Sequence, residues 1–220
     1  VTDDDGATAT ATETVQVARA PDDDPPSVTV HRPTGGEVIR GGESYTIRWS
    51  ATDGDAVDSV ALAYSADGGS SWSTIASGLS NTGSYDWNVP TDDTTQAKVR
   101  VNASDAAGNV ASDESGVFSV DTTKPGIDPL EVTTTDANPG GQNGEVTVDW
   151  RVTDAVALKN LTVRLDGNGG RVETPPVSGQ SADDVTTFTG VESGTYSVVV
   201  VVHDEAGRER ERSTTVTVEK

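Results

Sequence analysis

Cysteine and methionine are both absent from this sequence of 220 residues, and histidine occurs only as His31 and His203. Without cysteine the chain has no disulfide framework and no thiolate that acts as a nucleophile or a metal ligand. Two isolated histidines also argue against a zinc site, which needs paired histidine or cysteine ligands. We therefore expect the fold to depend on its apolar core, or on a hard cation held by oxygen ligands.

Basic residues are scarce: 15 Lys and Arg stand against 36 Asp and Glu, which gives a formal net charge of −21. A chain with this charge repels the phosphate backbone, so a nucleic-acid binder is excluded and anionic membranes are poor partners. An acid-rich surface with so few lysines resembles that of proteins from extreme halophiles, especially haloarchaea. The resemblance implies a stability that rises with salt, because the Debye length falls to about 3 Å in molar salt. The lysines are Lys98, Lys124, Lys159 and Lys220.

Long apolar segments are missing too. The longest is SVVVVV near Val198, which is shorter than the roughly 18 residues of a membrane-spanning helix and suits a buried central strand. We therefore expect no membrane insertion of this segment. The sequence also shows no signal peptide, so an extracellular location requires a signal that was removed or lies upstream.

The chain contains an internal repeat. The stretch SYTIRWSATD, residues 44–53, resembles GEVTVDWRVTD, residues 144–154, and their tryptophans Trp49 and Trp150 lie 101 residues apart. Both tryptophans occupy matched positions on alternating strands, so we expect them in a core and not at a ligand. A period of about 100 residues is the size of one seven-stranded β-sandwich.

A second landmark gives the same period. Asp105 and Asp204 each open a D-x-x-G turn and lie 99 residues apart, and Asp3 opens a third such turn 102 residues before Asp105. The opening stretch VTDDDGATATATETVQV, residues 1–17, thus resembles the last hairpin of a PKD-type domain whose earlier strands are not in this sequence. The other units resemble the tandem immunoglobulin-like and fibronectin-III-like domains of microbial surface proteins.

Short alternating segments between Gly, Pro and Asp turns predict an all-β fold: two tandem seven- to eight-stranded immunoglobulin-like sandwiches, preceded by the last strand or strands of a third. In the first unit we expect strands near residues 27–31, 37–40, 44–52, 58–65, 71–76, 84–88, 96–103 and 110–120. In the second we expect them near 129–135, 145–153, 158–166, 170–174, 184–189, 194–203 and 208–218. The predicted parts are a PKD-like remnant (1–20), a linker (21–26), a first sandwich (27–120), a linker (121–125) and a second sandwich (126–220).

Aspartates recur at one end of each predicted sandwich, where the preceding linker and two loops meet. Carboxylates that converge repel one another unless a hard cation lies among them, and Ca²⁺ prefers six to eight oxygen ligands from flexible loops. Linker calcium sites of this kind recur in the bacterial immunoglobulin-like adhesin repeats and cadherin-like stalks that these units resemble. The predicted ligands are Asp121, Asp154 and Asp204 in the second unit, and Asp53 and Asp105 in the first, where Asp55 and the linker residues Asp22 to Asp24 lie nearby.

A plainer interpretation of these aspartates stays open: Asp and Asn favour turns for local reasons, and this chain is acidic throughout. A solvated turn carboxylate would then need no cation. The sequence alone leaves both interpretations standing.

The stretch SADGGSSW, from Ser65 to Trp72, resembles the Asp box of sialidase propeller blades. It occurs once, whereas a propeller needs recurring boxes, so we interpret it as a structural hairpin turn. Trp72 and Trp87 lie beside turns. We expect core or edge positions for them, and the alternative is that they are exposed together and stack on a sugar ring.

No enzyme is predicted. His203 beside Asp204 has no G-x-S-x-G nucleophile elbow to serve, so a catalytic triad is not supported. Asn102 and Asn160 open glycosylation sequons, although one or two sequons arise by chance in a chain this rich in Ser and Thr.

The resemblance implies a non-catalytic extracellular structural or adhesive module of a microbial surface stalk, surface layer or filament, stiffened by Ca²⁺ at the domain junctions. Its partners would be other surface-protein domains or copies of itself, including strand addition through Val1 to Val17. The alternative is an accessory carbohydrate- or substrate-binding region of a secreted hydrolase, which exposed coplanar tryptophans would favour.

Overall fold

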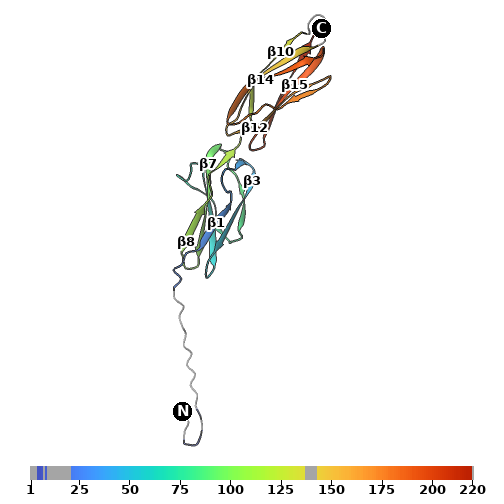
Figure 1. Cartoon of the computed structure of the whole chain (residues 1–220). Helices are drawn as coiled ribbons and strands as arrows, with labels where there is room; N and C mark the ends of the chain where they lie inside the picture. Colours follow the sequence, from blue (N-terminus) through green and yellow to red (C-terminus); the bar gives the residue numbers. More distant parts are fainter. Residues whose placement is uncertain (1–3, 7, 9–20, 137–142, 220) are drawn as a thin grey trace.

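A computed structural model describes residues 4–6, 8, 21–136 and 143–219. All the regular secondary structure in these ranges is β-strand, and the strands build two β-sandwiches that lie end to end (Figure 1). The all-β tandem predicted from the sequence is confirmed. The predicted PKD-like remnant, and with it the strand proposed for strand addition, lies almost wholly outside the described residues.

The first sandwich contains nine strands within residues 21–121, all of which are described. One sheet has the order β1-β3-β6; the other has the order β2-β9-β7-β4-β5, and β8 pairs with β7 as well. The strands are β1 (Ser27–Arg32), β2 (Val38–Arg40), β3 (Ser44–Thr52), β4 (Val57–Ser65), β5 (Ser73–Leu79), β6 (Ser84–Asn88), β7 (Thr94–Asp105), β8 (Val110–Glu114) and β9 (Phe118–Asp121).

The second sandwich contains seven strands within the described residues 122–136 and 143–219. Three form the sheet β10-β11-β14, and four form the sheet β13-β12-β15-β16. The strands are β10 (Gly126–Thr135), β11 (Gly144–Thr153), β12 (Leu158–Asp166), β13 (Arg171–Glu173), β14 (Ser181–Val191), β15 (Gly194–Asp204) and β16 (Glu209–Val218).

Successive side chains of a strand point to opposite faces of its sheet, and β15 shows this. On β15 the side chains of Val198, Val200 and Val202 point into the core and are fully buried, because successive residues of a strand face opposite sides of the sheet. Val199 faces the other side and is still only 6% exposed. The predicted central strand is therefore confirmed: β15 has β12 on one side and β16 on the other.

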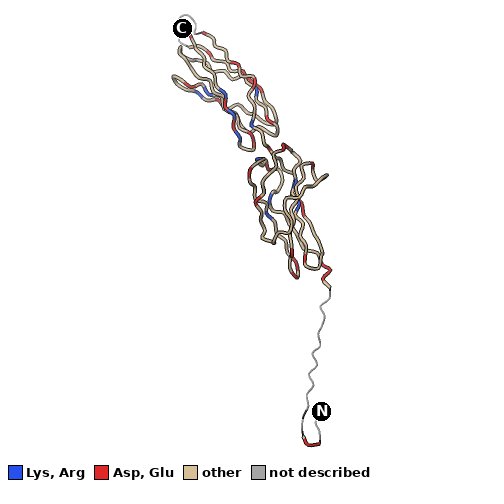
Figure 2. Tube along the Cα trace, turned by 180° about the vertical axis from the view of Figure 1, so that it is seen from behind, with Lys and Arg blue, Asp and Glu red and all other residues tan. Residues whose placement is uncertain are grey.

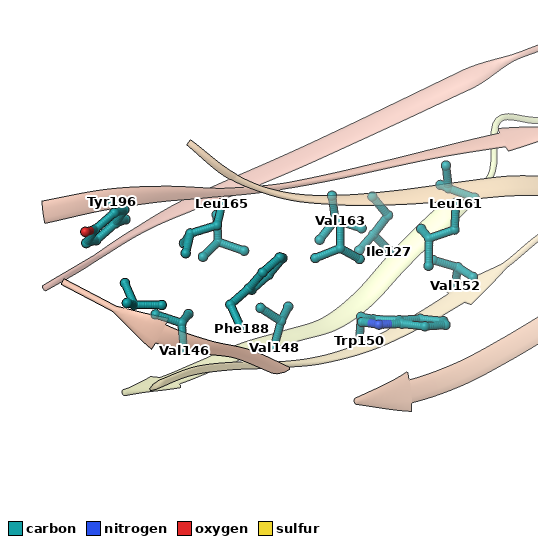
Figure 3. Packing of buried hydrophobic residues seen from close by; sticks show 14 of the residues in the cluster. Ile127, Val146, Val148, Trp150, Val152, Leu161, Val163, Leu165, Phe188 and Tyr196 are labelled. Atoms are coloured by element: carbon teal, nitrogen blue, oxygen red, sulfur yellow. The ribbon is translucent and has the colours of Figure 1, made fainter. Parts of the chain in front are cut away.

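Each sandwich has its own hydrophobic core. The first is built around Trp49 and Trp87, the second around Trp150, and all three indoles are at least 95% buried. Trp150 also donates a hydrogen bond from Nε1 to Thr186 Oγ1 at 2.9 Å, which satisfies its one polar group. The predicted core positions of Trp49 and Trp150 are confirmed. Figure 3 shows alternate residues of β11 facing those of β12 across this core: Val146, Val148, Trp150 and Val152 against Leu161, Val163 and Leu165.

The strand predicted over 110–120 is divided in two. β8 pairs with the second half of β7, whereas β9 pairs with the first half of β7 and, in parallel, with β2, so the pairing is interrupted between them. Gly116 lies at the break against the loop before β2, where an added Cβ would lie 2.5 Å from the carbonyl oxygen of Thr34. This contact joins positions more than 80 residues apart and is not visible in the local sequence.

The junction between the sandwiches is short, and three arginines form hydrogen bonds along it. β9 ends at Asp121 and β10 begins at Gly126. Arg208 and then alternate residues of β16 donate hydrogen bonds to main-chain carbonyls of the linker and of β10. The pairs are Arg208 with Asp121, Arg210 with Pro125, and Arg212 with Ile127, at 3.2, 3.3 and 2.9 Å.

Acidic residues outnumber basic ones along both sandwiches (Figure 2). In the described part of the chain, no helix has the length and apolarity that crossing a bilayer requires.

Candidate metal centres

Three aspartates meet at the junction of the two sandwiches. Asp121 ends β9, Asp154 follows β11 and Asp204 ends β15. One carboxylate oxygen from each lies within 4.8 Å of those from the other two. Asp121 and Asp204 are fully buried, and Asp154 is 9% exposed. The structure therefore brings together the three residues that the sequence predicted for the second unit.

One oxygen of each carboxylate in this junction cluster is held by main-chain N–H groups. Oδ1 of Asp154 accepts from Val156 and Ala157, both at 2.8 Å. Oδ1 of Asp204 accepts from Arg208 N at 2.7 Å, and Oδ1 of Asp121 accepts from Thr123 N at 3.1 Å. These bonds are the turn role that the plainer interpretation assigned to the aspartates.

The second oxygen of each carboxylate is left over. Oδ2 of Asp121, of Asp154 and of Asp204 is buried and has no hydrogen-bond partner among the described residues. A buried acceptor without a partner costs free energy, more so when it is charged. A turn role accounts for one oxygen of each residue and leaves the other three unexplained.

The electrostatics of the junction cluster disfavour three negative charges. Burial raises the pKa of Asp121 to about 6, and the carboxylates of Asp154 and Asp204 add to this effect although the hydrogen bond from Thr123 opposes it. Burial likewise raises the pKa of Asp204, again with the help of Asp154. A cation among the carboxylates would reverse this penalty.

The donor set fits a hard divalent cation. All the candidate ligands are carboxylate oxygens, which Ca²⁺ prefers and which do not select soft transition metals. At Ca–O distances of 2.3–2.6 Å, two oxygens bound to one ion lie up to about 5 Å apart, and the spacing of the cluster agrees with this.

A second trio lies at the other end of the first sandwich. Asp22 in the preceding linker, Asp53 after β3 and Asp105 at the end of β7 also place one oxygen each within 4.8 Å of the others. This linker cluster is less buried, because only Asp105 is shielded from solvent at 4% exposure. A depression of about 370 Å³ beside it is lined by Asp22, Asp53 and their neighbours.

The linker cluster differs from the junction cluster in its hydrogen bonding. Both oxygens of Asp105 are occupied: Oδ1 accepts from the main chain of Gly108 and Asn109, and Oδ2 accepts from Asn109 Nδ2 at 2.8 Å. Burial raises the pKa of Asp105, but the bonds from Asn109 and the turn lower it by more. The case for a cation is therefore stronger at the junction cluster.

The five aspartates predicted as ligands thus fall into two clusters, and the structure adds Asp22 from the predicted acidic linker. The repeat carried the signal for this residue, since Asp22 precedes Asp121 by 99 residues, as Asp105 precedes Asp204. Asp55 lies outside the cluster, and its N–H donates to Asp53 Oδ1 at 2.8 Å.

Two residues that the sequence analysis missed hold the linkers against these clusters. Asn109 Nδ2 donates to the carbonyl oxygen of Asp22 at 2.9 Å, and Arg208 Nη2 donates to that of Asp121 at 3.2 Å. Both follow the glycine of the D-x-x-G turn. The repeat shows that the two residues occupy equivalent positions. Because one is an amide and the other a guanidinium, the sequence does not indicate that both hold a linker carbonyl.

The segment from Ser65 to Trp72 forms the turn between β4 and β5. Asp67 accepts from Ser65 Oγ and from both the N–H and the hydroxyl of Ser71, and these bonds lower its pKa to about 2. Trp72 Nε1 donates to Gly69 O at 3.0 Å. These contacts agree with the interpretation as a structural hairpin.

All four tryptophans lie in the described ranges. Trp87 is 5% exposed, and its ring lies 5.1 Å from that of Tyr64. Trp72 is half-buried, with Arg100 over its ring. The coplanar exposed pair that would favour carbohydrate stacking is therefore not formed.

The remaining polar candidates lie apart from the clusters. His203 Nε2 is 3.0 Å from Glu209 Oε2, while the carboxylate of its neighbour Asp204 belongs to the junction cluster. Of the two sequon residues, Asn160 is exposed on β12 and Asn102 is half-buried on β7, between β4 and β8.

Residues 26–101 match the family model described as a bacterial Ig domain. The matched residues lie in the first of the two tandem β-sandwiches. This match covers most of the first immunoglobulin-like sandwich, and the second has the two-sheet strand arrangement described above. No curated protein sequence matches the chain.

Among solved structures, the fibronectin(III)-like modules of Clostridium thermocellum CbhA align with a TM-score of 0.45 at 17% identity, over 88% of this chain and 94% of that one. Latent PorU from Porphyromonas gingivalis aligns with a TM-score of 0.31 at 12% identity, over 88% and 24% of the two chains. A Salmonella alpha-2-macroglobulin mutant aligns with a TM-score of 0.33 at 12% identity, over 93% and 15%. This chain spans a quarter or less of the latter two proteins.

Proposed function

We propose that this chain is a non-catalytic structural or adhesive part of an extracellular microbial surface protein, such as a stalk, a surface layer or a filament. Bacterial Ig domains are typically modules of extracellular and surface proteins, which agrees with the family match in the first sandwich. The buried tryptophans favour this role over that of an accessory carbohydrate-binding region in a secreted hydrolase, the alternative, because stacking on sugars needs exposed rings.

The proposal includes Ca²⁺ as the ion that stiffens the junction. One observation carries it: the junction cluster contains three buried carboxylate oxygens that have no partner among the described residues. A Ca²⁺ ion would bind Asp121, which the first sandwich supplies, and both Asp154 and Asp204, which the second supplies. Bound in this way, it would resist bending between the sandwiches. Extracellular calcium modules bind with Kd values of about 10⁻⁴–10⁻³ M.

The test is calorimetric titration of the protein with CaCl₂ in about 1 M NaCl, where screening suppresses diffuse binding of cations to the acidic surface. We expect saturable binding, and we expect Asp154→Ala to remove the stronger site. Asp149→Ala is the matched control, because Asp149 is an exposed aspartate of β11 in the same sandwich. Its affinity should equal that of the wild type.

Binding should also raise the melting temperature, because an ion that binds only the folded state stabilises it by about 2.7 kcal/mol at a hundred times its Kd. A titration without saturable heat, together with a melting temperature that is equal in Ca²⁺ and in EDTA, would refute the calcium part of the proposal.

A further inference from the structure

The loop between β15 and β16 forms hydrogen bonds across the junction in both directions. Arg40 at the end of β2 donates from Nε to Ala206 O at 2.6 Å and from Nη2 to Gly207 O. In the opposite direction, Arg208 Nη2 donates to Gly41 O at 3.0 Å. Each sandwich thus extends one arginine to a main-chain carbonyl of the other.

Arg208 also contacts two members of the junction cluster. Its N–H donates to Asp204 Oδ1 at 2.7 Å, and its guanidinium donates to the carbonyl oxygen of Asp121 at 3.2 Å. The same carbonyl accepts from Gly41 N at 2.8 Å. Asp121 therefore faces the cluster with its carboxylate and the arginine with its main chain.

The close approach at this point requires glycine. A Cβ on Gly41 would lie 2.7 Å from the carbonyl oxygen of Pro90, which is closer than real Cβ contacts. Gly207 has φ of +78°, and a Cβ there would lie 3.1 Å from Arg40 Nη2. Glycine at position 41 thus lets this turn pack against Pro90, and glycine at position 207 leaves room for the guanidinium of Arg40.

The first sandwich repeats half of this arrangement. Asn109 N donates to Asp105 Oδ1 at 2.9 Å, and Asn109 Nδ2 donates to the carbonyl oxygen of Asp22. Asn109 and Arg208 lie 99 residues apart and make the same two contacts with equivalent aspartates. Arg208 in addition reaches Gly41 of the neighbouring sandwich.

We infer that Arg208, supported by Arg40, is a positioning residue of the junction cluster, so that cation binding and the docking of the two sandwiches are coupled through Asp121. The inference rests on the proposed calcium site and names what controls it. Coupling of this kind is reciprocal: a change that loosens the docking of the sandwiches weakens cation binding, and loss of the cation loosens the docking.

Electrostatics alone predicts the opposite change in Ca²⁺ affinity when either arginine is removed. Arg208 and Arg40 carry positive charge and lie close enough to lower the pKa of Asp204, against the larger effect of burial. Removing either charge should therefore tighten cation binding if positioning were unimportant. The sign of the change in Ca²⁺ affinity separates the two accounts.

The experiment uses a background in which Asp22→Asn and Asp53→Asn remove the linker cluster, and it titrates CaCl₂ in about 1 M NaCl. We expect Arg208→Ala to raise the Kd by about 10- to 100-fold, the usual cost of losing a partner that orients a ligand. Arg164→Ala removes the same charge from the outer face of β12 and should change the Kd by less than about twofold.

Arg208→Asn introduces the residue that the first sandwich has at the equivalent position, Asn109. We expect the Kd to stay raised, because the amide of Asn109 donates to Asp105 Oδ2 as well as to the linker carbonyl, and an equivalent bond at position 208 would occupy Asp204 Oδ2. We also expect looser docking, because asparagine does not reach Gly41. Residual dipolar couplings of the backbone amides would show this as a wider spread of relative orientations than in the wild type, in EDTA as well as in Ca²⁺.

Equal or tighter binding by Arg208→Ala, with normal binding by the background protein, would overturn the coupling alone. A background protein that binds no Ca²⁺ would refute the proposed site and the coupling together. If Arg208→Ala fails to fold, Arg40→Ala gives the same decision, since it loosens the same loop without contacting the cluster.

Discussion

The guanidinium carbon of Arg100 lies 3.9 Å from the centroid of the Trp72 ring. Glu114 accepts hydrogen bonds from Arg100 at 3.0 and 2.6 Å and from Lys98 at 3.1 Å, which holds the guanidinium in place. The indole thus joins the β4–β5 turn to strands β7 and β8 on the outside of the first sandwich. Its role is structural.

Replacing this indole should destabilise the first sandwich. We expect Trp72→Ala to lower its free energy of unfolding by about 1–2 kcal/mol, since it removes a cation–π contact and the hydrogen bond to Gly69. Trp72→Phe keeps a ring under Arg100 and should cost less. Urea unfolding measures both, and equal stability of the alanine variant and the wild type would contradict this role.

The junction cluster predicts an unusual response to pH in the absence of metal. The pKa of Asp121 is raised from 3.8 to about 6, so folding disfavours its ionised form. The stability associated with the protonated carboxyl is fully present below about pH 4 and is lost as the pH rises through about 6. In EDTA we therefore expect a melting temperature higher at pH 5 than at pH 7.5, by about 5 °C or more.

The acidity of the whole surface acts in the same direction, so a variant is needed to isolate the cluster. Asp121→Asn cannot ionise and should show a smaller difference between pH 5 and pH 7.5 than the wild type. Added Ca²⁺ should diminish the difference in the wild type only. Identical pH profiles of the two proteins in EDTA would assign the effect to the general surface charge.

Salt should stabilise both sandwiches. With a net charge of −21 the folded chain repels itself, and the Debye length falls from about 10 Å at 0.1 M salt to about 3 Å at 1 M. We expect thermal melts to shift upward steadily between about 0.1 M and several molar NaCl. KCl should act equally, because screening does not depend on the cation, and a melting temperature independent of salt would contradict the halophilic interpretation.

The second core should respond to the loss of one side chain. Leu161 is 1% exposed and lies in the cluster around Trp150, so Leu161→Ala leaves a cavity that should cost about 2–5 kcal/mol. Val172→Ala is the control, because that valine is 58% exposed and its truncation should change stability by less than about 0.5 kcal/mol. Urea unfolding of the two variants checks this, and similar midpoints would argue against the packing described.

Much of this architecture was predictable because its causes are local. The apolar run around Val198 marks a central strand from its own residues, and the matched positions of Trp49 and Trp150 set the period of the fold. Asp121, Asp154 and Asp204 were predicted to converge because sandwich topology brings the linker and two loops to one pole, wherever the side chains then point.

What was missed depends on contacts across long distances in the sequence. The break at Gly116 comes from the loop at Thr34, and the grip of Arg208 on Gly41 spans 167 residues. Asn109 and Arg208 differ in charge and length, so composition does not suggest that they do the same work. The three junction-cluster oxygens that lack a partner among the described residues result from the three-dimensional hydrogen-bond pattern and have no signal in the sequence.

The arginines on β16 affect how the second sandwich would bear a load. β10 begins at the junction, while β16 runs away from it and ends at Val218, beside Gly194 at the far end. Tension along the chain would therefore pull β10 and β16 in opposite directions along their lengths. The hydrogen bonds of the β10–β11 and β15–β16 ladders, and those from Arg210 and Arg212, would be loaded in shear and would break together instead of one at a time.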